Sequence, residues 1–100
     1  MSAPSLQSLH AGLDALGEAV GRDDLEDADR IMADYDLALR RYIEQAGTRA
    51  PLDGLRGLLR LQNAVVADLR ARRQRAADAL RHERRARSAQ RAYASGGTAP

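Results

Sequence analysis

The chain has 100 residues, which allows a single domain, and 44% of them are hydrophobic, with no Trp, no Phe and three Tyr. It contains no cysteine, which excludes disulfides and thiolate chemistry, and its sequence shows neither a signal peptide nor an apolar run of membrane-spanning length. The net charge of +2 hides an asymmetry, because residues 1–50 hold ten acids and five arginines, whereas residues 51–100 hold four acids and eleven arginines. We therefore expect a cytoplasmic protein without membrane insertion, whose two halves attract each other.

The first predicted helix covers residues 5–20. Its large aliphatic residues recur at spacings of three and four, which places them on one stripe: Leu6, Leu9, Leu13, Leu16 and Val20. The interior glycines Gly12 and Gly17 each cost about 1 kcal/mol relative to alanine, so this helix should depend on packing. Gly21 is its predicted end.

The second predicted helix covers residues 24–46. Asp23 followed by Glu26 resembles a capping box at its start, and Gly47 is a stop signal after its end. The apolar stripe again alternates spacings of three and four: Leu25, Ala28, Met32, Tyr35, Leu39, Tyr42 and Ala46. Leu37 lies opposite this stripe and is interpreted either as an ordinary exposed residue or as part of an interface.

The third predicted helix begins at residue 52 and has the widest apolar face, about half of its circumference. We expect a seam in which Met32, Tyr35 and Leu39 pack against three residues of this helix, Leu58, Val65 and Leu69. Two short neighbouring helices do not cover the rest of the face. The surplus, which includes Leu52, Leu59 and Val66, is therefore predicted to bind a partner.

After Leu80 the sequence becomes basic and loses its large aliphatic residues. The helix is predicted to continue to Tyr93, with a break near residue 82 left open, and residues 94–100 are predicted to be disordered. Tyr93 is interpreted either as an idle exposed ring or as a docking anchor together with Arg84, Arg85 and Arg87. The predicted fold is all-α: one domain over residues 1–100, an antiparallel three-helix bundle, or a four-helix bundle if the third helix breaks.

No constellation for catalysis, cofactor binding or metal binding is readable. His10 and His82 are far apart in sequence, and the acids at residues 23–29 lack the glycine and the ligand spacing of a calcium loop. The arginines of residues 70–91 are interrupted by acids and have no interleaved aromatic residues, so a small basic DNA-associated protein is the less favoured alternative. The sequence predicts a binding protein that is not an enzyme.

The order of elements resembles the FliT family of flagellar type III export chaperones over about residues 6–94. The resemblance rests on a short first helix, an acid-capped second helix opening Gly21-Arg22-Asp23-Asp24-Leu25, a long third helix, and a basic end that closes with Arg91-Ala92-Tyr93. Family members frequently carry Trp in the helix-two opening, where this chain has Asp23 or Asp24.

The resemblance implies a helical chaperone that binds the C-terminal segment of the filament cap protein, keeps it unpolymerised and delivers it to the export ATPase and the export gate. A homodimer is compatible with the surplus apolar face. The alternatives kept open are a chaperone or a stalk-like coiled-coil component for another type III secretion substrate. The sequence does not identify the cargo.

Overall fold

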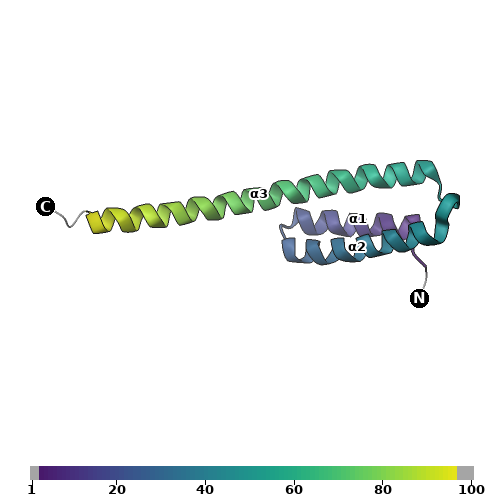
Figure 1. The fold of residues 1–100 in the computed structure, drawn as a ribbon, viewed down its shortest axis with the longest axis horizontal. Coiled ribbons are helices and arrows are strands. Elements are labelled where there is room, and N and C mark those ends of the chain that lie inside the picture. The colour runs from purple at the N-terminus through teal and green to yellow at the C-terminus, as the bar shows by residue number, and fades with distance from the viewer. Residues whose placement is uncertain (1–2, 97–100) are drawn as a thin grey trace. The chain divides into compact units, whose positions relative to one another are not determined.

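The computed structural model describes residues 3–96. It contains the helices α1 (Leu6–Gly21), α2 (Leu25–Ala46) and α3 (Leu52–Gly96), with a short 3-10 turn, η1 (Gly47–Arg49), between α2 and α3 (Figure 1). No strand occurs in this part of the chain. The predicted all-α class, with three helices of which the last is the longest, is confirmed.

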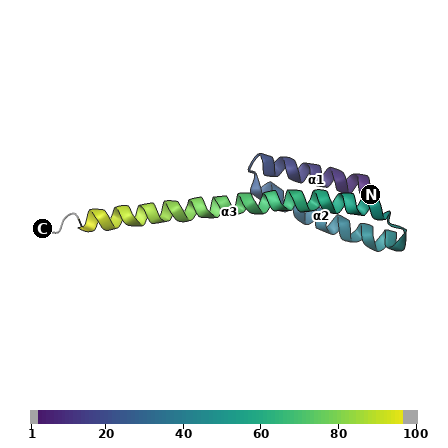
Figure 2. The same cartoon turned by 90° about the horizontal axis from the view of Figure 1, so that it is seen from above.

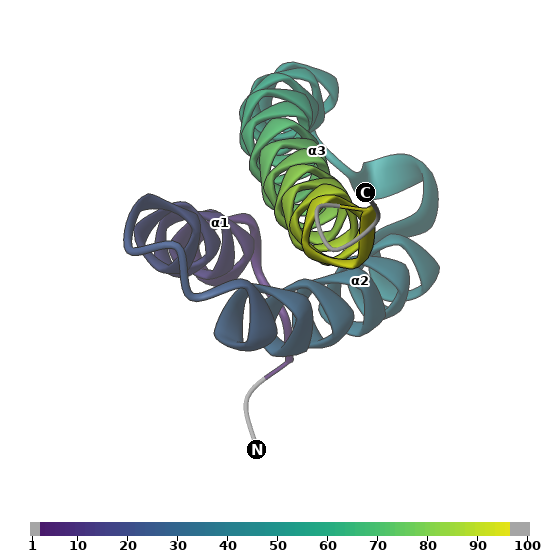
Figure 3. The same cartoon turned by 90° about the vertical axis from the view of Figure 1, so that its left-hand side faces the viewer.

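The chain divides into two units, Met1–Arg70 and Ala71–Pro100. The first unit holds α1, α2 and the beginning of α3, which lie side by side (Figure 2) and form the corners of a triangle when viewed end-on (Figure 3). The second unit is the remainder of α3, where every side chain at residues 73–95 is exposed. The core of the protein therefore belongs to the first unit.

Helix α1 supplies most of the buried core. Among the described residues, the buried hydrophobic side chains are Leu9, Leu13, Leu16, Ala19, Val20, Ala28, Tyr35, Leu58 and Leu69. The predicted α1 stripe is thus confirmed, with Leu6 partly buried at its edge. Helix α1 approaches both neighbours, because an added Cβ at Gly12 would lie 3.5 Å from Tyr35 Cδ2 and one at Gly17 would lie 4.0 Å from Val65 Cγ2.

The predicted seam between α2 and α3 lies within this core. Tyr35, Leu58 and Leu69 are buried, and the partly buried side chains packed against them include Met32, Leu39 and Val65. The Tyr35 hydroxyl donates a hydrogen bond of 2.9 Å to Gln62 Oε1, which joins α2 to α3. Burying a tyrosine ring is favourable when its hydroxyl finds such a partner.

The corner between α1 and α2 is a Schellman motif. The Asp23 amide donates to the Val20 carbonyl and the Asp24 amide donates to the Ala19 carbonyl, both at 3.0 Å. Asp23 has φ of 57°, the left-handed conformation that glycine usually supplies at this position. The predicted capping residue was therefore wrong by one position: Asp24 caps α2 by accepting from the Asp27 amide at 3.1 Å.

Helix α3 is continuous through residue 82 and ends at Gly96, so the break that the sequence left open does not occur. Residues 94–96 are helical, which corrects the predicted disordered end there, and residues 97–100 lie outside the described residues. The physical reason is composition. Neither glycine nor proline occurs between residues 58 and 95, and alanine and arginine are good helix formers. Pairs one turn apart, such as Gln74 with Asp78 and Glu83 with Arg87, add support.

Candidate functional site

The predicted partner-binding residues of α3 are largely uncovered. Leu52, Leu59 and Val66 are spaced by seven residues and therefore share one face of the helix, which we call the α3 stripe. Leu52 is 62% exposed and Leu59 is 45% exposed. Val66 is only half-buried, so it contributes less free surface than expected.

The α3 stripe lies on the side of α3 that is nearer α2. Gln62, which bonds to Tyr35 of α2, is only about 60° from Leu59 around the helix at ~100° per residue. Gly54, which approaches Leu6 of α1, is about 140° away from Leu59 on the same scale. A partner that lies on the stripe would therefore also meet α2.

Helix α2 adds an exposed apolar residue that the sequence did not single out as a site residue. Ile43 is 50% exposed, and it is turned about 140° away from Ala38, which faces α1. That turn places Ile43 on the side of α2 directed toward α3. In the sequence, Ile43 lies at the border of the apolar stripe of this helix. Periodicity alone cannot tell whether a residue at such a border is buried or exposed.

The structure does not bring Leu37 together with the α3 stripe. Leu37 is 49% exposed and follows the buried Tyr35 by two residues, which turns it about 200° away from the core face. A single exposed leucine is ordinary on a protein surface. Leu37 is therefore the natural comparison residue for the stripe, because its exposure is similar and its face is different.

The predicted residues of the basic end all lie in the second unit and are exposed: Arg84, Arg85, Arg87 and Tyr93. Arg84 and Arg87 share a face of α3, whereas Arg85 and Tyr93 point in other directions at ~100° per residue. Arg87 forms a salt bridge of 3.2 Å with Glu83. Tyr93 is 83% exposed, so among the described residues it is not covered as a docked anchor would be.

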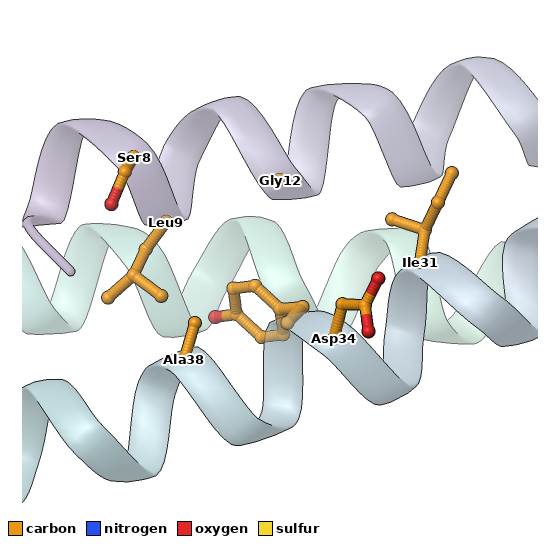
Figure 4. Close-up of a pocket in the computed structure, with 7 residues that line it drawn as sticks. Ser8, Leu9, Gly12, Ile31, Asp34 and Ala38 are labelled. Carbon is orange, nitrogen blue, oxygen red and sulfur yellow. The ribbon is translucent and has the colours of Figure 1, made fainter. Parts of the chain in front are cut away.

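A pocket of about 210 Å³ opens between α1 and α2 (Figure 4). We call it the α1–α2 pocket; it is lined by Ser8, Leu9, Gly12, Ile31, Asp34, Tyr35 and Ala38. In Figure 4 the side chains of Leu9 and Asp34 extend into the space between the two helices. Burial, with a smaller contribution from the charge of Asp36, raises the pKa of Tyr35, so its hydroxyl stays protonated and keeps its hydrogen bond.

The sequence did not predict the α1–α2 pocket. Gly12 carries no side chain and Ala38 carries a short one, so little fills the space between α1 and α2 at these positions. A glycine within a helix is a weak signal by itself. Only the pairing of α1 with α2 shows which residues face each other.

A larger hollow of about 380 Å³ at the start of α2 is polar: Asp24, Glu26, Asp27 and Arg30 line it. Asp27 and Arg30 pair with each other across it, Asp27 also pairs with Arg22 at 3.3 Å, and Asp24 accepts a hydrogen bond of 3.1 Å from the Asp27 amide. The hydrogen bond and the charge of Asp27 raise the pKa of Arg30. The hollow is a satisfied helix cap.

Comparisons of the chain with protein-family models, with curated proteins and with solved structures found no match. Over residues 3–96, no helix combines the length and apolarity needed to cross a bilayer. Within the same residues, no group of three or more His, Cys, Asp and Glu side chains is placed to hold a metal ion.

Proposed function

We propose that the protein is a non-catalytic cytoplasmic chaperone of flagellar type III export, which binds the C-terminal segment of the filament cap protein on the α3 stripe. The observation that carries this proposal is the exposure of Leu52 and Leu59 on a helix whose other face is packed into a core. Exposed leucines in a row are the feature that an amphipathic partner helix recognises. The link to flagellar export comes from the resemblance to the FliT family.

The expected affinity follows from the size of the exposed surface. Burying one leucine side chain completely is worth about 1.5–3 kcal/mol, and the stripe offers two exposed leucines and the half-buried Val66. Association also costs at least about 4 kcal/mol in lost translational and rotational freedom. These three side chains alone leave a balance of at most about 5 kcal/mol, which is weak binding. The moderate affinity that suits a chaperone releasing its cargo to the export ATPase and export gate therefore requires further contacts with α2, where Ile43 is 50% exposed.

The proposal is tested by the assembly of the cap protein. Light scattering of purified cap protein should show assembly alone, and no assembly when an equimolar amount of this protein is present. Leu59→Asp should lose this protection, because a carboxylate on the stripe must be desolvated against an apolar partner. Leu37→Asp is the matched control. Protection that survives in Leu59→Asp would contradict the proposed site.

The basic helix supports a second candidate function, binding to nucleic acid. Residues 71–100 hold eight arginines and two acids, and the described part of this segment is almost entirely exposed. However, Asp78 pairs with Arg81 and Glu83 pairs with Arg87, and these acids reduce the positive electrostatic potential of the segment. A fluorescence titration with a labelled duplex distinguishes the two, because phosphate binding must weaken steeply as salt rises.

A stalk-like coiled coil is not favoured by the arrangement of apolar residues. A coiled-coil seam needs an apolar residue at intervals of three and four along the whole helix. Over residues 73–95 the large apolar residues are Leu80 and Tyr93 alone, thirteen positions apart. The apolar surface for a partner therefore lies in the first unit, on the α3 stripe.

A further inference from the structure

The two units carry opposite charge. Residues 1–70 hold twelve acids and eight arginines, and residues 71–100 hold two acids and eight arginines. Surfaces with complementary charge attract each other during encounter and fix the register of the complex. A second copy of the chain therefore presents each unit with an oppositely charged partner.

The first unit, which is acidic, contains the α1–α2 pocket, and this pocket can accept a side chain of another molecule. Its wall is mostly apolar, and Asp34, which is exposed, is the one acidic residue among those that line it. Among the described residues, Asp34 forms no salt bridge, although its charge contributes to the raised pKa of Arg30. A cavity of about 150 Å³ already holds a benzene-sized group, so a pocket of about 210 Å³ has room for an aliphatic side chain.

The basic unit carries a ligand of matching chemistry. Leu80 is 44% exposed, and it is the only large aliphatic residue after Leu69. Arg84 lies one helical turn further on the same face, followed on that face by Arg87 and Arg91. Within residues 3–96, Arg84 and Arg91 form no salt bridge, whereas Arg87 pairs with Glu83.

We propose that the α1–α2 pocket of one copy binds Leu80 of a second copy, and that Arg84 of the second copy pairs with Asp34 at the rim. Burial of the Leu80 side chain supplies the attraction, and the guanidinium–carboxylate pair fixes the direction of the helix. Tyr93 is the less suitable ligand, because the face that it shares with Ala86 and Ala89 carries no arginine one turn away. This inference does not depend on the identity of any cargo.

Sedimentation equilibrium of the full chain between about 10 and 500 µM tests the contact. We expect the mean mass to rise above that of one chain as concentration increases, and the association to weaken with added salt. Asp34→Arg and Arg84→Asp should each weaken the association at least tenfold, which is about 1.4 kcal/mol. The double variant Asp34→Arg/Arg84→Asp should restore it to within about threefold, since the pair is only reversed.

Matched variants separate this contact from a general effect of charge or apolarity. Glu44→Arg makes the same charge change as Asp34→Arg on an exposed position of α2 and should leave the association unchanged. Leu80→Ser should weaken the association, whereas Leu37→Ser, of similar exposure, should not. A single-chain mass at every concentration, or a double variant no better than either single one, overturns the proposal. So does an association that is abolished by Tyr93→Ala and unaffected by Leu80→Ser.

Discussion

Replacing Tyr35 by Phe tests how α2 is held against α3. The change removes the hydroxyl that donates to Gln62 Oε1 at 2.9 Å and leaves the buried ring in place. Because the ring still fills its space, no cavity forms, and the loss reflects the hydrogen bond alone. A hydrogen bond of this kind contributes about 0.5–1.5 kcal/mol. Gln62 is half-buried, so water can partly replace the lost donor, and we expect a loss near 1 kcal/mol.

The double-mutant cycle with Gln62→Leu isolates the pair. Tyr35→Phe, Gln62→Leu and the double variant are unfolded with urea and followed by circular dichroism at 222 nm. We expect a coupling energy of about 0.5–1.5 kcal/mol, because the second substitution removes a bond that the first has already removed. Losses that simply add, with coupling indistinguishable from zero, would refute the role of this hydrogen bond.

Three further outcomes follow from the packing and the charges. First, the raised pKa of Tyr35 means that the folded state holds its proton more tightly than the unfolded state. This stabilisation is complete below the unfolded pKa of about 10 and is lost as pH rises from there through the folded pKa, so alkaline unfolding should be shallower in Tyr35→Phe. Second, Gly17→Ala should raise the free energy of unfolding by about 0.5–1 kcal/mol, because the new Cβ lies 4.0 Å from its nearest neighbour. Gly54→Ala should gain less, since its Cβ would lie 2.7 Å from a side-chain atom that must move, and urea unfolding in which Gly54→Ala gained more would contradict this packing. Third, deletion of residues 84–100 should leave the urea midpoint within measurement error, because all the buried hydrophobic side chains of the part of the chain that the structure describes precede residue 84. A deleted chain that unfolds at a lower urea concentration would show that residues 84–100 contribute to the core.

The spacing of the apolar residues was sufficient to predict the three helices and the all-α class of the fold. The α1 stripe from Leu9 to Val20 could be predicted because a helix that buries one face repeats its apolar residues every three or four positions. That α1 would supply most of the buried core could not be predicted, because its apolar stripe is narrower than that of α3. Burial depends on being flanked by two helices, and the sequence of one helix does not contain that information.

Local backbone geometry explains the errors at the helix ends. Asp23 and Asp24 have the same side chain, so the sequence does not show which of them caps α2. Asp23 adopts the left-handed conformation that ends α1, and Asp24 is therefore the N-cap of α2. Ser5 and Ser8 form a reciprocal capping box at the start of α1, with hydrogen bonds of 2.8 and 3.1 Å between side chain and amide. Its sequence signal is weak, because Ser8 occupies the position where Glu or Gln is usual.

The candidate site was partly predictable. Exposure of Leu52 and Leu59 follows from an apolar face on α3 that is too wide for its neighbours. Val66 lies near the edge of that face and is half-buried, so a charged substitution there disturbs the fold as well as the surface. The α1–α2 pocket was beyond sequence reasoning, because it arises from the absence of a side chain at Gly12 opposite Ala38.

Calorimetric titration of the full chain with the C-terminal segment of a filament cap protein shows whether the α3 stripe binds this cargo. We predict saturable one-to-one binding that weakens at least tenfold in Leu59→Asp and stays unchanged in Leu37→Asp, two exposed positions on different faces. Circular dichroism of both variants should show an intact helical fold. No binding by the unmodified chain, or equal binding by all three proteins, would contradict the assignment of the α3 stripe as the partner site.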